Sequence, residues 1–172
     1  MATYGTTKGA KTLEKSAESG IIKINSPISN RESYKGRPTA IYTLDVELSK
    51  RQQRILDSLA EYDSQQIFKK DDVSMVDLSA LTAKTGMEFA MFTRGSQRLV
   101  IRGGANHVNV DIKKAKNLAN MGYKFSGHTH PGGDYSCLIA SGNDYEILKI
   151  FGQTKSVTYN SKGHYLTYEL EG

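Results

Sequence analysis

The spacing of apolar residues changes at Gly86, and this change constrains the fold more than any other feature of the sequence. Between Asp72 and Gly86 apolar side chains recur at helical spacing, and glycine commonly ends a helix. After Gly86, residues 87–93 and 98–102 have the composition of two strands around the turn Arg94–Gln97, which is the pattern of a β-hairpin. Helices that alternate with such strands predict an α/β domain with a mixed sheet.

The same alternation continues through the rest of the chain. Residues 49–62, 111–121 and 141–151 are expected to form helices, because each follows a capping residue: Ser49, Asp111 and Ser141. Short strands are expected at 107–110, 123–130, 156–159 and 164–168.

The N-terminal part has a different composition. Residues 1–20 are rich in Gly, Thr, Ser and Lys and are expected to be a flexible lead-in. Residues 21–48 contain two prolines and short extended pieces at 21–24 and 40–46, so we expect an extension that packs on the domain. The domain itself is expected to span residues 49–172.

Composition excludes several classes of protein. No apolar run approaches the roughly 18 residues that cross a bilayer, and the first 20 residues lack the apolar segment of a secretory signal. The single cysteine, Cys137, excludes an internal disulfide and a thiolate-rich zinc cluster. The net charge of +5 is spread along the chain, so neither a membrane nor a nucleic acid is an expected partner.

The stretch GHTHPGGDYSCLIASGND, residues 127–144, is the densest run of possible metal ligands. On a strand, His128 and His130 point to the same face, while Thr129 points to the other. Asp144 lies one turn into the following helix, close enough to offer a carboxylate oxygen to the same ion. Two His and one Asp leave a fourth tetrahedral position open, which is the usual layout of a catalytic zinc.

Two further residues suit hydrolysis at such a site. Glu88 is an acidic residue in an otherwise apolar strand, where a charge is costly unless it is paired or functional, and it is a candidate general base. A structural ion pair is the alternative role for Glu88. Ser141 is a candidate for stabilising an oxyanion, with simple helix capping as its alternative. A zinc deaminase is excluded because it needs a Pro-Cys-x-x-Cys segment.

The constellation resembles the motif of JAMM (MPN-type) metalloproteases, in which a Glu precedes a His-x-His pair and a downstream Ser-x-x-Asp. The matching residues are Glu88, His128-Thr-His130-Pro131 and Ser141-Gly-Asn-Asp144. The resemblance implies a cytidine-deaminase-like JAMM/MPN fold, with a curved mixed sheet flanked by helices. It also implies His128, His130 and Asp144 as Zn²⁺ ligands, Glu88 as general acid/base and Ser141 as oxyanion stabiliser.

Residues 70–170 are similar in layout to JAB-like domains at the C-termini of bacterial polymorphic toxins and phage-related proteins. This similarity implies a protein or peptide substrate, ubiquitin-like proteins included, and an immunity protein as partner if the chain is a toxin. It implies a place in the bacterial cytoplasm or delivery within a larger toxin. The ten residues between His130 and Ser141 are more than is common in eukaryotic deubiquitinases, which predicts a different rim to the site. A non-catalytic MPN-like interaction module is the alternative function.

Overall fold

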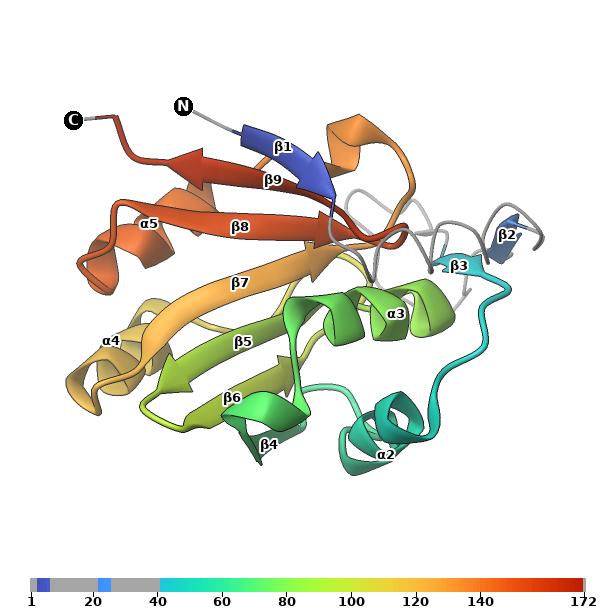
Figure 1. Ribbon diagram of the computed structural model, residues 1–172. Helices are drawn as coiled ribbons and strands as arrows, with labels where there is room; N and C mark the ends of the chain where they lie inside the picture. Colours follow the sequence, from blue (N-terminus) through green and yellow to red (C-terminus); the bar gives the residue numbers. More distant parts are fainter. Residues whose placement is uncertain (1–2, 7–21, 26–40, 172) are drawn as a thin grey trace.

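The computed structural model describes residues 3–6, 22–25 and 41–171. Its main feature is a seven-stranded sheet in the order β1-β9-β8-β7-β5-β6-β4 (Figure 1). Neighbouring strands are antiparallel except β7 and β8, which are parallel, so the predicted mixed sheet is confirmed. The strands span Thr3–Thr6 (β1), Gln65–Lys69 (β4), Phe89–Arg94 (β5), Gln97–Arg102 (β6), Lys124–His130 (β7), Lys155–Asn160 (β8) and His164–Glu169 (β9).

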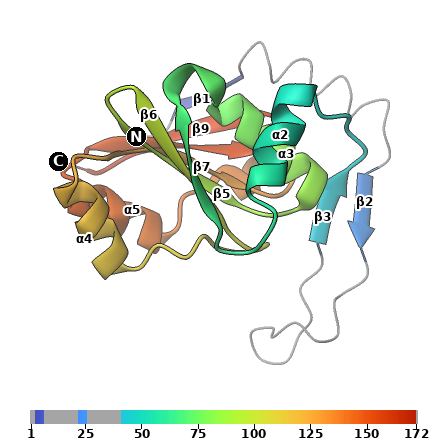
Figure 2. The ribbon, with the colours of Figure 1, turned by 90° about the horizontal axis from the view of Figure 1, so that it is seen from below.

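Helices cover both faces of this sheet. Figure 2 shows α2 (Lys50–Ser58) and α3 (Met75–Thr85) on one side, with α4 (Ile112–Asn120) and α5 (Gly142–Ile150) on the other. Each face has its own apolar core, because β5 alternates its side chains between them: Ala90 and Phe92 face α4 and α5, whereas Phe89 and Met91 face α2 and α3. The sequence therefore folds as a helix–sheet–helix sandwich.

A two-stranded ribbon of β2 (Ile22–Asn25) and β3 (Ile41–Leu44) lies beside the end of α3 (Figure 2). Leu44 and Val46 are buried against Ala80 and Ala83 of α3. Gly86, with φ of 72°, caps α3, and a side chain there would meet the carbonyl oxygen of Tyr42 at 2.7 Å. The end of α3 therefore needs glycine both for its conformation and for the close approach of β3.

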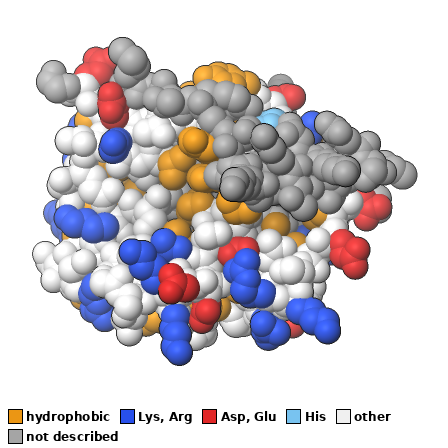
Figure 3. All heavy atoms as spheres, in the orientation of Figure 1, with side chains coloured by type: hydrophobic (Ala, Val, Ile, Leu, Met, Phe, Trp, Pro, Cys, Tyr) orange, Lys and Arg blue, Asp and Glu red, His pale blue; other side chains and the backbone are white. Residues whose placement is uncertain are grey.

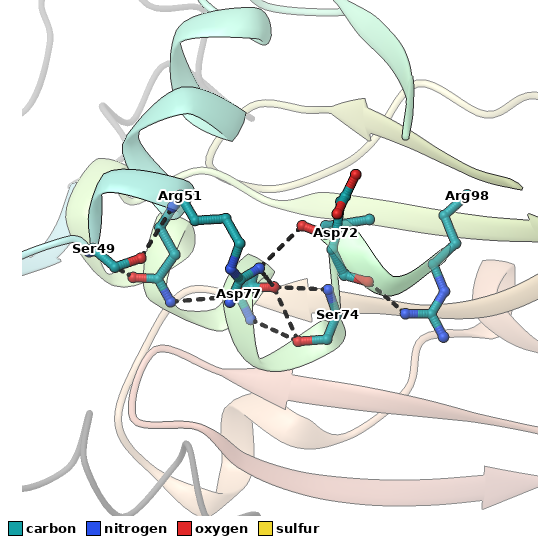
Figure 4. Close-up of polar contacts among 8 residues, drawn as sticks. Ser49, Arg51, Asp72, Ser74, Asp77 and Arg98 are labelled. Atoms are coloured by element: carbon teal, nitrogen blue, oxygen red, sulfur yellow. Dashed lines mark hydrogen bonds and ion pairs between the residues drawn. The ribbon is translucent and has the colours of Figure 1, made fainter. Parts of the chain in front are cut away.

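A polar network joins α2 to the start of α3 (Figure 4). Arg51 donates two hydrogen bonds to the buried carboxylate of Asp77, at 2.6 and 2.7 Å, and Gln52 donates a third at 3.1 Å. Asp77 also accepts from the backbone N–H of Ser74, at 2.9 Å, within a capping box. The four α-helices in the described part of the chain all begin on a polar side-chain cap, and this network fixes the packing of two of them.

Most predicted elements are confirmed. The helix expected at 72–86 begins at Met75, because Ser74 rather than Asp72 caps it, and the helix expected to reach residue 62 ends at Ser58. A short 3-10 helix, η2 (Lys70–Asp72), occupies the expected start, and β4 was not predicted. Residues 3–6, within the expected flexible lead-in, form β1 and pair with β9. The rest of residues 1–20 lies outside the described residues.

The strand predicted at 107–110 is wrong. This segment makes tight local turns, with Gly104 N–H donating to His107 O and Val110 N–H to Val108 O. Strands β5, β6 and β7 already have neighbours on both sides, so no sheet edge is available to it there. Residues 103–111 instead form a loop, which helps to line a cavity described below.

Among the described residues, no helix is both long and apolar enough to cross a bilayer. On the face seen in Figure 3, basic and acidic side chains are interspersed rather than gathered into one patch.

Candidate metal centre

Strand β7 carries both histidines at its C-terminal end, as the spacing predicts. His128 is paired with Ala90 of β5 and faces the core under α4 and α5, where its ring stacks on Phe125 at a centroid distance of 5.7 Å. Thr129 faces the other way and is fully buried; its hydroxyl accepts from the N–H of Phe89 at 2.9 Å and contacts Thr82 Oγ1 at 2.6 Å. The strand is thereby held on both faces.

Three ligand atoms converge at this end of the strand. His128 Nε2 lies 3.0 Å from His130 Nε2 and 3.3 Å from Asp144 Oδ1, and the group's ligand atoms all lie within 4.8 Å of one another. Two imidazole nitrogens and a carboxylate oxygen at such separations could hold one metal ion. The prediction that His128, His130 and Asp144 form a metal-binding group is therefore supported by geometry.

A backbone carbonyl orients His130. Its Nδ1–H donates to the carbonyl oxygen of Cys137, in the 3-10 helix η3 (Tyr135–Leu138), at 2.7 Å. A carbonyl can only accept, so Nδ1 carries the proton and Nε2 keeps the lone pair that a metal requires. Burial and the nearby His128 lower the pKa of His130 to about 4, which leaves this imidazole neutral at pH 7.

Asp144 has two roles because its two oxygens point to different partners. Oδ2 accepts from the N–H of Ser141 at 2.7 Å and completes the capping box of α5, while Oδ1 lies beside His128. Burial favours a higher pKa for Asp144, but its contacts with His128 and with the Ser141 N–H prevail and lower it to about 2. The carboxylate is ionised at neutral pH, as a metal ligand must be.

Ser141 is the N-cap of α5, and its hydroxyl oxygen accepts from the N–H of Asp144 at 3.3 Å. Accepting that bond uses a lone pair and leaves the O–H of Ser141 available to donate. The side chain is exposed and lines the cavity beside the three ligands. Capping and oxyanion stabilisation are therefore compatible for this serine.

Glu88 lies immediately before β5, with its backbone paired to the loop at Gly103 and Gly104. Its side chain is buried, and Oε1 lies 3.3 Å from His130 Nε2, while Oε2 has no hydrogen-bond partner among the described residues. Burial, with the negative charge of Asp144, raises the pKa of Glu88 to about 8. A buried carboxyl with one free oxygen and a raised pKa is suited to exchanging a proton near neutral pH.

A cavity of about 910 Å³ opens from these residues toward α4 and α5. Polar residues line part of it, and aliphatic side chains from both helices and from two loops line the rest: Val108, Val110, Ile112, Ile139, Ile147 and Ile150. The loops at 103–107 and 132–140 both contribute to the walls. The three candidate metal ligands therefore line a large pocket in which aliphatic side chains lie beside them.

Sequence reasoning missed two contributors to the site. The Cys137 carbonyl was invisible to it because a backbone group leaves no trace in a side-chain motif. His107 was given no role, yet it lines the cavity and its Nε2 lies 2.8 Å from the hydroxyl of Tyr62. His107 lies far from the His-x-His pair in the sequence, so no spacing pattern marked it as part of the site.

Comparisons with models of protein families, with curated proteins and with solved structures find no match for this chain.

Proposed function

We propose that this protein is a zinc-dependent hydrolase of peptide or isopeptide bonds with a JAMM/MPN-type fold. One observation carries the proposal: His128, His130 and Asp144 converge within 4.8 Å, and the buried carboxyl of Glu88 lies 3.3 Å from one of these ligands. A purely structural site would not need a second, partly unsatisfied carboxyl at its border.

Zinc suits this donor set better than other common ions. Two imidazoles and one carboxylate are the ligands of several hydrolytic zinc sites, whereas magnesium and calcium prefer oxygen donors alone. Bound there, the ion would supply Lewis acidity and lower the pKa of a water to about 7. His130 Nε2 and the Asp144 carboxylate are already in the protonation states that binding requires.

The remaining chemistry belongs to the protein's own side chains. Glu88 would accept a proton from the attacking water at its carboxylate and later donate it to the leaving amine. The Ser141 hydroxyl, with its lone pair committed to the N–H of Asp144, would donate a hydrogen bond to the developing oxyanion.

The apolar cavity bears on the substrate. Aliphatic walls beside the ligands favour a protein or peptide that places large apolar side chains next to the scissile bond. We therefore propose a polypeptide substrate, with ubiquitin-like proteins as one class to test. The toxin or processing-domain role, and an immunity protein as partner, are proposed on the family resemblance alone.

The decisive experiment combines metal content with hydrolysis. Purified wild type is expected to hold about one zinc per chain, and His128→Ala almost none, whereas His164→Ala, outside the ligand group, is expected to keep it. Glu88→Gln should retain zinc but lose peptide hydrolysis by about 100-fold or more. Glu61→Gln, an exposed carboxyl on a loop, serves as its matched control.

Two results would contradict the proposal. Absence of zinc from the wild type after incubation with the ion at neutral pH would exclude the metal centre. Zinc binding with equal, background hydrolysis by wild type and Glu88→Gln, over a panel of peptides and tagged proteins, would favour the non-catalytic interaction module.

The cavity can be tested separately once a substrate is cleaved. Ile139 is 60% exposed and lines the cavity, so Ile139→Asp should leave folding intact and reduce kcat/KM about 10-fold for substrates with an apolar side chain there. Ile67→Asp on β4, at a residue 48% exposed and away from the metal-binding group, is the control. Equal kcat/KM for both variants would exclude the cavity as the substrate site.

A further inference from the structure

A group of buried polar atoms lies behind the metal-binding residues without hydrogen-bond partners among the described residues. It comprises the Nδ1 of His128 and the hydroxyls of Ser156, Thr158 and Tyr168. Thr158 is fully buried, and the other three residues are nearly so. Buried polar groups usually have partners, so four orphans in one region of a sheet indicate a function for at least some of them.

The sheet register places all four side chains on one face. His128 of β7 is paired directly with Thr158 of the parallel strand β8, and Ser156 of β8 is paired with Tyr168 of β9. Residues two apart on a strand share a face, so Ser156 and Thr158 point the same way. The rings of His128 and Tyr168 meet edge to face at a centroid distance of 6.2 Å. Thr158 is therefore the immediate cross-strand neighbour of His128.

Metal binding sets a requirement on the far side of the His128 ring. A histidine that ligates through Nε2 carries its proton on Nδ1, and this N–H needs an acceptor that fixes the ring. For His130 the acceptor is the Cys137 carbonyl. For His128 no backbone carbonyl or carboxylate fills that role within the described part of the chain. A threonine hydroxyl can accept the bond directly or through one bridging water.

We propose that Thr158 is a positioning residue for the metal centre: when His128 ligates a metal, the Thr158 hydroxyl accepts a hydrogen bond from Nδ1–H of His128, directly or through one water, and holds the ring in its ligating tautomer. The inference rests on the zinc site proposed above. Ser156 and Tyr168 complete the polar group on the same face of the sheet. Burial and the charge of Asp144 raise the pKa of Tyr168; the Ser156 hydroxyl partly opposes this rise, although it does not reach hydrogen-bond geometry. Tyr168 thus remains a neutral hydroxyl.

The test is zinc affinity, measured by competition with a chromophoric chelator on the full chain. Thr158→Val replaces the hydroxyl with a methyl group and should weaken zinc binding about 10- to 100-fold, the usual effect of losing a partner of a ligating histidine. Thr158→Ser, which keeps the hydroxyl, should bind zinc with an affinity close to that of the wild type. Thr167→Val, on the neighbouring strand β9 and paired with Val157 instead, should bind zinc as the wild type does.

A second measurement separates positioning from folding. The Thr158 hydroxyl has no partner among the described residues, so metal-free Thr158→Val should have a Tm no lower than that of the wild type. In zinc-loaded wild type, NMR of the imidazole nitrogens should show His128 protonated at Nδ1, with a slowly exchanging proton that Thr158→Val loses.

Each contrary result has a distinct meaning. Equal zinc affinity for wild type and Thr158→Val overturns this inference alone, and so does a large fall in the Tm of metal-free Thr158→Val, because Thr158 would then be a structural residue. A wild type that binds no zinc overturns both the inference and the proposed function.

Discussion

At the scale of single residues, the site depends on side chains that make two different contacts at once. Asp144 caps a helix with one oxygen and faces His128 with the other, and Ser141 both caps that helix and lines the cavity. His130 donates a hydrogen bond from Nδ1–H to the Cys137 carbonyl and keeps the lone pair of Nε2 available for a metal ion. Such sharing fixes Asp144 and His130 from two sides, which would lower the entropy lost on binding an ion.

The two contacts of Asp144 can be separated by substitution. Asp144→Asn keeps an oxygen to accept from the Ser141 N–H but lacks the negative charge, so α5 should persist while zinc affinity falls by more than the roughly 10- to 100-fold typical of an outer partner. Asp144→Ala should lose zinc equally and also lower the free energy of unfolding by about 1 kcal/mol through loss of the cap. Chelator competition and urea unfolding of the metal-free proteins measure the two effects. Equal unfolding free energies for the two variants would contradict the separation.

Thr129 lies between the two histidines, and its substitution by valine should destabilise the metal-free protein, whereas that of Thr158 should not. Its hydroxyl satisfies the buried N–H of Phe89, next to Glu88. Thr129→Val leaves that donor unpaired and should reduce the free energy of unfolding by about 1–3 kcal/mol. Urea denaturation of the metal-free protein, beside Thr167→Val, measures this loss. A free energy of unfolding equal to that of the control would show that the Phe89 N–H finds another partner.

At the scale of elements, the site is assembled where β7 ends and α5 begins, with Glu88 supplied from the start of β5. The neighbouring pair β7–β8 is parallel, so the C-terminal ends of both strands meet at this edge of the sheet. On the opposite face, α2 and α3 are tied together by Arg51 and Asp77. That connection stabilises the helix layer behind the strand that carries the ligands.

The Arg51–Asp77 pair gives a prediction at this scale. Asp77 is 2% exposed and Arg51 is half-exposed, so Arg51→Met leaves a buried carboxylate with fewer donors. We expect the free energy of unfolding to fall by about 1–3 kcal/mol, moderated by the donors that Ser74 and Gln52 still provide. Arg54→Met on the same helix, at an exposed arginine, is the control in urea unfolding. A loss no larger than that of Arg54→Met would show that the remaining donors suffice.

At the scale of the whole molecule, local signals in the sequence predict most of the fold. Ser49, Asp111 and Ser141 each mark a helix start, because capping depends only on residues three positions away. The strand predicted at 107–110 and the unpredicted β4 show the limit, since strand pairing depends on which sheet edge is free. In the site, the sequence pattern singles out five side chains, Glu88, His128, His130, Ser141 and Asp144, whereas the roles of the Cys137 carbonyl and of Thr158 depend on tertiary register.

Binding of zinc to the folded state alone should stabilise the molecule as a whole. At a free zinc concentration about 1,000 times Kd, the free energy of unfolding rises by about 4 kcal/mol, which for a chain of this size corresponds to a Tm increase of roughly 10 °C. Differential scanning calorimetry with zinc and then with a chelator should show a reversible shift for the wild type. His128→Ala should show none; a shift of the same size in that variant would place the bound ion elsewhere.

The sequence Ser-x-x-Asp occurs twice in this chain as a complete capping box. At the start of α3, Ser74 and Asp77 cap the helix, and the carboxylate binds Arg51. At the start of α5, Ser141 and Asp144 form the same box, and the carboxylate faces a histidine. During divergence, therefore, helix stability alone can preserve Ser-x-x-Asp whether or not the proposed chemistry is kept. A descendant that kept Ser141 and Asp144 but not His128 and His130 would retain the capping box without the proposed metal site, so the histidine pair is the better marker of the proposed activity.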